Sequence, residues 1–294
     1  MSQEPQPDQL PQPSDMEALL TRLRSIAKFK ERSHDTSKKA HIPLLREAYK
    51  DFRNGTGPGP AICLVGDSMI ERMTIMGKTL NFVAPWPSPF MMDETTAGLA
   101  AVLGRLGRVF NAGVGGDRIQ NIAYRLAGTS GVGQPALKDG HESGEENVDD
   151  TNLPALLPLL ASFRTIKLWV VQAGTNNLMP KKGFKNADRD ALRVLLRTLL
   201  DVNPVGGECR VLVTGLFYRR DLTRELVDEA NEKIRAVVKE LNEECGCERV
   251  TFLPACEQVN TDEHLEDHVH LMLEGYKLWM KELVPAVLSL LSRE

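Results

Sequence analysis

Short apolar runs alternate with longer amphipathic stretches from residue 61 to the end of the chain. The runs are rich in Val, Ile, Leu and Phe with little polar alternation, which is typical of strands buried on both faces of a parallel sheet. Five strands are therefore predicted, at 61–65, 108–111, 166–172, 210–214 and 250–253. Helical patterns between and after the strands are centred on 119–126, 153–162, 188–202, 224–243 and 273–292. This alternation predicts βαβ units and a three-layer α/β/α sandwich.

The first 60 residues follow a different pattern. Residues 1–14 are rich in Pro and Gln and hold no aromatic residue, so a disordered tail is expected. Over 15–60, leucine and isoleucine recur at helical spacing until the Gly and Pro of RNGTGPGP end the pattern, which predicts a helical N-terminal extension. Residues 61–294 are predicted to form one domain.

Two segments inside that domain look inserted. The first is VAPWPSPFMMDETTAG at 83–98, and the second is GTSGVGQPALKDGHESGEENVDD at 128–150. The second is rich in Gly and acidic residues, so we expect a mobile surface loop there.

Composition limits the classes of binding partner and the cellular location that we expect for the protein. The chain has 294 residues, 42% hydrophobic and 26% charged, as is ordinary for a soluble globular protein. Its formal net charge of -4 provides no basic field, which argues against nucleic acid and anionic membranes as partners. No apolar run is long enough for a membrane span, and no signal pattern opens the chain. With an odd count of five cysteines, reduced thiols and a cytoplasmic location are expected.

Unusual polar residues follow four of the predicted strands. The first strand ends in GDS, the second in NAGVGGDR and the third in QAGTNN, while NTDEHLEDHVH follows the fifth. In an open parallel sheet, ligands bind outside the carboxyl ends of the strands. These four segments are therefore the place to look for chemistry.

Each segment also has an ordinary structural interpretation. Ser68 and Glu71 fit the S-x-x-E capping box of a helix N-terminus. The glycines before Asp117 allow a strand-to-helix turn with that residue as N-cap. Asn176 and Asn177 fit turn residues whose amides cap their own backbone.

The sequence patterns of dinucleotide-binding, phosphate-binding and zinc-protease sites do not match this chain. Arg118 stands where a dinucleotide-binding G-x-G-x-x-G needs its last glycine, and no G-K-[ST] follows a Gly-rich turn. Three histidines lie close together but match no zinc-protease spacing; they are His264, His268 and His270. Neither a metal nor an organic cofactor is therefore expected.

Taken together, the four segments hold the parts of a serine hydrolase. A serine hydroxyl needs an imidazole base, and the imidazole needs a carboxylate that orients it. Ser68, His270 and Asp267 could supply these groups. The tetrahedral intermediate needs N–H donors for its oxyanion, each worth roughly 3–4 kcal/mol. The backbone N–H groups of Ser68 and Gly116 and the side-chain amide of Asn176 could supply them.

In this order, the segments resemble the conserved blocks of the SGNH hydrolases, a branch of the GDSL lipase/esterase superfamily. The blocks are GDS at 66–68, NAGVGGD at 111–117, GTNN at 174–177 and DHVH at 267–270. Within the family, VGDSM, NAGVGGDRIQNIAYRL and VVQAGTNNL are most similar to the catalytic subunits of intracellular platelet-activating-factor acetylhydrolase. Asn177 departs from the aspartate that many members carry.

The resemblance implies a nucleophile at Ser68 and the other two triad members at Asp267 and His270. It also implies an oxyanion hole from Ser68, Gly116 and Asn176, a flavodoxin-like order 2-1-3-4-5 for the five parallel strands, and a homodimer. The G-x-S-x-G elbow of the α/β-hydrolases is absent.

His264 and His268 compete with His270 for the role of the base. We favour His270 because it stands three residues after Asp267 and directly before an apolar run. The hydroxyl of Ser68 is then predicted to point towards His270 and not into its own helix.

The resulting hypothesis is a serine esterase that hydrolyses short-chain, in particular acetyl, esters through an acyl-enzyme intermediate. Its substrate would be a small-molecule or lipid-like ester, and no substrate-binding residue is predicted. Two alternatives stay open. One is a non-catalytic binding or scaffold protein on the same fold, and the other is a thioesterase or acyltransferase that uses the same triad.

Overall fold

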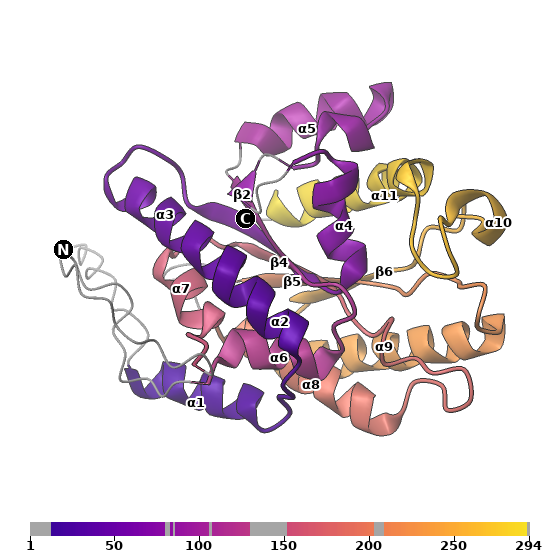
Figure 1. The fold of residues 1–294 in the computed structure, drawn as a ribbon, viewed down its shortest axis with the longest axis horizontal. Coiled ribbons are helices and arrows are strands. Elements are labelled where there is room, and N and C mark those ends of the chain that lie inside the picture. The colour runs from indigo at the N-terminus through magenta and orange to yellow at the C-terminus, as the bar shows by residue number, and fades with distance from the viewer. Residues whose placement is uncertain are drawn as a thin grey trace.

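The computed structural model describes residues 13–79, 83–84, 86–105, 108–129, 152–202 and 209–292. Within these residues one sheet has the strand order β2-β3-β1-β4-β5-β6 (Figure 1). The strands are β1 Pro60–Gly66, β2 Val83–Ala84, β3 Arg108–Gly113, β4 Leu168–Gln172, β5 Arg210–Thr214 and β6 Val250–Leu253. All neighbours pair in parallel except β2, which lies antiparallel to β3 at the edge.

The five parallel strands confirm the predicted fold. Numbered along the chain without β2, they follow the order 2-1-3-4-5, and each lies within two residues of its predicted bounds. The two-residue strand β2 was not predicted, because a run so short has no periodicity of its own.

Helices cover both faces of the sheet (Figure 1). One face carries α4, α5 and α11, and the other carries α1, α3, α6, α7, α8 and α9. Their bounds are α1 Pro13–Arg24, α2 Glu31–Thr36, α3 Ile42–Arg53, α4 Ser68–Met76, α5 Glu94–Arg105, α6 Ile119–Ala127, α7 Leu156–Ser162, α8 Asn186–Asp201, α9 Arg224–Cys245, α10 Thr261–His264 and α11 Leu273–Leu291. A π-helical turn, η1 Ser37–His41, joins α2 to α3, and a 3-10 turn, η2 Pro89–Met91, precedes α5.

Strand β1 shows why both faces are needed. Its side chains alternate, with Ile62 and Leu64 in one buried apolar cluster and Cys63 and Val65 in the other. Because successive residues of a strand point to opposite faces, an apolar run buries its whole length only between two helical layers.

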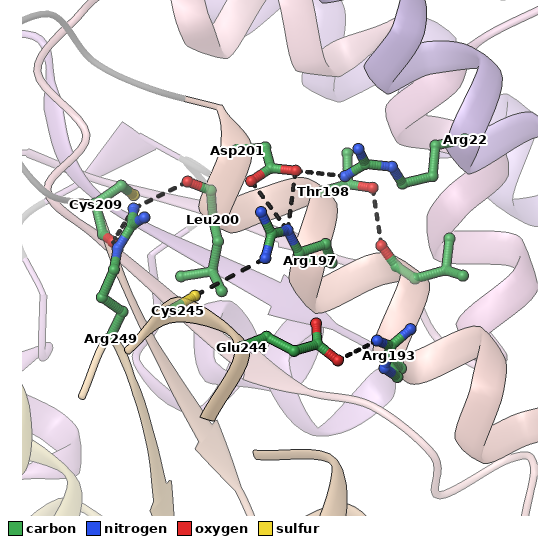
Figure 2. A network of polar contacts seen from close by, with 11 residues as sticks. Arg22, Arg193, Arg197, Thr198, Leu200, Asp201, Cys209, Glu244, Cys245 and Arg249 are labelled. Atoms are coloured by element: carbon green, nitrogen blue, oxygen red, sulfur yellow. Dashed lines mark hydrogen bonds and ion pairs between the residues drawn. The ribbon is translucent and has the colours of Figure 1, made fainter. Parts of the chain in front are cut away.

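The N-terminal helices share the core of the sheet. Leu19, Leu20 and Leu23 of α1 are buried in the same cluster as α6 and α8. Figure 2 shows Arg22 of α1 bound to Asp201 at the end of α8, with 2.5 Å between nitrogen and oxygen. This ion pair and the leucines hold α1 against the helical layer.

Two predicted segments fall mostly outside the described residues, namely the tail at 1–14 and the insert at 128–150. The segment at 83–98 contains β2, η2 and the first turn of α5. Among the described helices, none is both long and apolar enough to cross a bilayer.

Candidate active site

Ser68 lies where β1 passes into α4. The strand ends at Gly66, Asp67 is the N-cap, and the helix begins at Ser68 itself. The Asp67 carboxylate accepts the backbone N–H of Met69 at 2.9 Å, so this carboxylate caps the helix. The hydroxyl of Ser68 is therefore free of the capping role.

The carboxylate of Glu71 does not cap the N-terminus of α4 either. It accepts the backbone N–H of Gly115 at 3.0 Å and the guanidinium of Arg32 at 2.8 Å. The capping-box interpretation of Ser68 and Glu71 is thus wrong, because both side chains find partners from other parts of the chain.

The hydroxyl of Ser68 instead points towards His270. Its oxygen lies 2.9 Å from Nε2 of the imidazole, and Nδ1 of the same ring lies 2.7 Å from an oxygen of Asp267. The predicted orientation of the hydroxyl is confirmed. In this arrangement the ring can accept the hydroxyl proton while the carboxylate stabilises the resulting imidazolium.

The loop after β6 fixes the Asp267 carboxylate in three directions. Its second oxygen accepts the backbone N–H groups of Val269 at 2.8 Å and His270 at 2.7 Å. Burial raises the pKa of Asp267, but the two backbone N–H groups and the imidazole outweigh it and hold that pKa well below its ordinary value. The carboxylate stays ionised, as the orienting partner of an imidazole must.

The two other histidines have different surroundings. Nδ1 of His264 accepts the backbone N–H of Asn260 at 2.9 Å, within the cap of α10. His268 is exposed, and its carbonyl accepts the backbone N–H of Arg220. In the part of the chain that the structure describes, no group of three or more His, Cys, Asp or Glu could hold a metal ion.

The turn after β3 lies against the start of α4. The amide of Asn111 donates to the carbonyl of Ile70 at 2.8 Å, and a side chain at Gly113 would overlap the backbone nitrogen of Glu71. This close approach requires glycine at that strand end. Gly116, two residues beyond Val114, has a φ of +75°, which also favours glycine.

The candidate oxyanion donors come from these two turns and from the loop after β4. Among the described residues, the backbone N–H groups of Ser68 and Gly116 donate to no protein acceptor. The amide of Asn176 donates one hydrogen to the carbonyl of Asp117 at 2.9 Å. An amide carries two N–H donors, so a second remains for a ligand.

Asn177 supports the turn without joining the site. Its oxygen accepts the backbone N–H of Ile119 at 3.0 Å, and its nitrogen donates to Asp188 at 2.6 Å. The interpretation that the two asparagines cap their own backbone is therefore wrong, because the amide of Asn176 donates to the carbonyl of Asp117 and that of Asn177 binds residues of α6 and α8.

Asp117 is buried in an ion pair. Its carboxylate accepts Nε of Arg125 at 2.8 Å, both side chains are fully buried, and the hydroxyl of Ser33 binds its other oxygen. The N-cap of α6 is Arg118 and not Asp117 as the local pattern suggests. The carboxylate turns inward because the buried guanidinium needs a counter-charge, while the side chain of Asn177 accepts the backbone N–H of Ile119 at the start of α6.

Asp67 is the second buried acid beside the site. Burial raises the pKa of this fully buried carboxyl to about 7, although the N–H of Met69 acts in the opposite direction. Asp67 therefore titrates near neutral pH one residue from Ser68.

Sequence reasoning missed two residues that hold the site together. Arg220 donates to three carbonyls of the segment that carries α10, those of Thr261, Asp262 and Leu265. The hydroxyl of Tyr276 in α11 donates to the carbonyl of Met69 at 2.8 Å. No local signal could have found them, since a single arginine or tyrosine carries no sequence signature that reveals a distant backbone partner.

No curated protein matches this chain. A protein from Streptococcus pneumonia, provisionally described as a platelet activating factor, is 15% identical, with 85% of this chain and 93% of that chain covered and a TM-score of 0.44. An acetylxylan esterase from Geobacillus stearothermophilus is 17% identical, with 81% and 96% covered and a TM-score of 0.47. A carbohydrate acetylesterase family member from Sinorhizobium meliloti is 14% identical, with 79% and 99% covered and a TM-score of 0.46.

The model of the GDSL-like lipase/acylhydrolase family matches residues 64–278, which is more than half of the 294 residues. The match begins in β1 just before Ser68 and extends beyond His270 into α11, so it spans the strand ends described above. The chain therefore belongs to the GDSL-like lipase/acylhydrolase family and is an ester hydrolase.

Proposed function

We propose that the protein is a serine esterase that cleaves short-chain, in particular acetyl, esters through an acyl-enzyme intermediate. The observation that carries this proposal is the continuous hydrogen-bonded series from Asp267 through His270 to the hydroxyl of Ser68, with distances of 2.7 and 2.9 Å. The preference for an acetyl group rests on the similarity of the sequence blocks to acetylhydrolase subunits.

In the first half of the reaction, the Ser68 oxygen attacks the ester carbonyl carbon while Nε2 of His270 takes its proton. Asp267 stabilises the imidazolium that forms. The carbonyl oxygen becomes an oxyanion, which accepts N–H groups from Ser68, Gly116 and Asn176. Each such donor lowers the barrier by roughly 3–4 kcal/mol.

The tetrahedral intermediate then collapses. The bond from carbon to the alcohol oxygen breaks, and the imidazolium of His270 gives its proton to the leaving alcohol. Water attacks the acyl group on Ser68 in the second half, with His270 again as base, and releases the acid. No step needs a metal or an organic cofactor.

A series of p-nitrophenyl esters of increasing acyl length, with purified full-length protein, tests the proposal. We expect kcat/KM to be highest for the acetyl ester, and a fluorophosphonate probe to label the protein. Ser68→Ala should lower kcat by about 10⁴-fold or more and remove labelling, with an unchanged melting temperature.

Ser162→Ala is the matched control, because Ser162 lies in α7 and, among the residues that the structure describes, its hydroxyl binds only the carbonyl of Leu159. This variant should keep full turnover and labelling. Turnover and labelling that survive in Ser68→Ala would refute the proposed nucleophile. A folded wild-type protein that neither turns over nor reacts with the probe would favour the binding-protein alternative.

A further inference from the structure

The N-terminal segment extends to the edge of the candidate site. Between α1 and α2, the backbone N–H of Lys28 donates to the carbonyl of Gln120 at 3.0 Å, and the amide of Asn121 donates to the carbonyl of Lys28 at 2.9 Å. These bonds hold residues 25–30 against the first turn of α6. Helix α2 follows directly and also lies beside α6 (Figure 1).

Both flanks of this segment are anchored. On one side Arg22 binds Asp201 of α8, and on the other the hydroxyl of Ser33 binds Asp117. Lys30 lies between these anchors as the residue before α2. Its backbone position is therefore defined relative to the turn that contains Gly116.

The ammonium of Lys30 lies directly over that turn. Nζ donates to the carbonyl of Gly115 at 3.3 Å, and a Cβ atom added to Gly116 would lie 2.5 Å from Nζ. Gly116 carries one of the N–H groups that we propose for the oxyanion. A positive charge thus stands beside the place where the substrate carbonyl would bind.

No residue that the structure describes serves as a counter-ion for this charge. In the described parts of the chain, Lys30 forms no ion pair, and its long hydrogen bond to one carbonyl is its single polar contact. Burial lowers the pKa of Lys30, and Arg32 and Arg118 lower it further, while Asp117 raises it. An ammonium that is partly withdrawn from water and lacks a carboxylate is ready to accept an external anion.

Arg118 is a second available cation. It stands two residues after Gly116 and is exposed, and within the described residues its guanidinium reaches only the sulfur of Met179 at 3.8 Å. Arg32 differs, because Glu71 already neutralises it at 2.8 Å. Two positive groups without a partner carboxylate in the described residues therefore border the turn, in a protein whose formal net charge is -4.

We infer that Lys30 and Arg118 form a subsite for an anionic group of the substrate, so that the preferred esters carry a carboxylate or a phosphate. This inference rests on the proposed esterase function. Charge-assisted hydrogen bonds from an ammonium or guanidinium to such groups are about twice as strong as neutral ones, and a partly buried site screens them less than water does.

The test compares matched acetyl esters that differ in charge. Para-acetoxybenzoate and para-acetoxyphenyl phosphate are the anionic substrates, and methyl para-acetoxybenzoate is the neutral one. Each kcat/KM is divided by the rate of hydroxide hydrolysis of the same ester, which removes differences in intrinsic reactivity. We expect the wild-type protein to favour an anionic ester by about tenfold, as one charge-assisted contact would give.

Lys30→Met keeps the length of the side chain and removes its charge, and it should lower the ratio of anionic to neutral kcat/KM by about tenfold. Lys30→Arg should retain most of the ratio. Lys28→Met is the matched control, since it removes one positive charge from the same segment at an exposed side chain and should keep the wild-type ratio. If Lys30→Met lowers kcat/KM more for para-acetoxybenzoate, the subsite binds a carboxylate; if it lowers kcat/KM more for para-acetoxyphenyl phosphate, the subsite binds a phosphate.

A measurement on the wild-type protein makes the test independent of folding in the variants. At about 1 M salt the Debye length falls to about 3 Å, so the anionic preference should shrink while the neutral rate changes little. Equal loss on both classes of ester in Lys30→Met, or a wild-type protein that turns over both classes equally, would overturn the subsite and leave the esterase in place. A wild-type protein that hydrolyses none of the esters and resists the fluorophosphonate probe would overturn the esterase itself.

Discussion

Removing the charge of Asp117 should destabilise the whole domain, because it leaves the guanidinium of Arg125 buried without a counter-charge. Both side chains are fully buried, and 2.8 Å separates Nε of Arg125 from the carboxylate. In the described part of the chain the guanidinium has one further partner, the carbonyl of Gly66, at 3.4 Å. Breaking such a buried pair from one side costs about 3–5 kcal/mol. A domain is stable by only about 5–15 kcal/mol, so the change is a large share of the total.

Urea unfolding of Asp117→Asn, Arg125→Met and the double variant measures this cost. Asp117→Asn preserves shape, so the loss of free energy reports charge and hydrogen bonding and not packing. The free energy of unfolding should fall by about 3–5 kcal/mol in each single variant. In the double variant it should fall by at least about 2 kcal/mol less than the sum of the two single effects, because neither charge is then left unpaired.

Glu274→Gln provides the exposed comparison. Glu274 pairs with Lys277 at 2.7 Å on the surface of α11, and its loss should cost less than about 1 kcal/mol. A cost for Asp117→Asn as small as this, or full additivity in the double variant, would refute the reasoning that burial makes the Asp117–Arg125 pair indispensable.

Two further predictions concern pH and packing. Burial raises the pKa of Asp67 to about 7 in the folded protein, whereas in the unfolded chain it is about 3.9. The folded state therefore binds the proton more tightly, and the free energy of unfolding should fall as the pH rises from about 4 to about 7. Asp67→Asn keeps an acceptor for the helix N-terminus and should lack this fall; urea unfolding curves with the same pH dependence in both proteins would contradict the assignment. Gly113→Ala should lower stability by about 1–3 kcal/mol in thermal unfolding, because its methyl group would overlap the backbone of α4. Gly98→Ala, in an open part of α5, should instead stabilise by about 0.5–1 kcal/mol, and similar effects at both positions would disprove the packing argument.

The five parallel strands were predictable because each consists mainly of apolar residues, and burial between two helical layers leaves little polar alternation in the sequence. Helix α5 was not predicted. Its sequence ETTAGLAAVLGR has two β-branched threonines in its first turn and contains two glycines, all of which weaken the helical signal. Tertiary contacts with α11 compensate for this low propensity.

In the candidate site, too, some contacts could be predicted from the sequence and others could not. The pairing of Ser68 with His270 could be anticipated, because catalytic chemistry dictates which side chains must meet. The partners of Glu71 and Asp117 could not be anticipated. The local sequence pattern predicts that each carboxylate caps a helix, whereas in the structure each one binds an arginine. Arg32 stands 39 residues from Glu71 in the sequence, and nothing in a short motif encodes so distant a contact.

The boundaries of the family match differ from the boundaries of the folded unit. The match begins at residue 64, inside β1, and ends at residue 278, inside α11. A fragment cut there would lack the buried leucines of α1 and the buried residues Trp279 and Leu283 of α11. Such a fragment would expose apolar surface on both faces of its sheet and tend to aggregate. Expression of this chain should therefore start from α1, because the part that the family model matches is smaller than the part that folds.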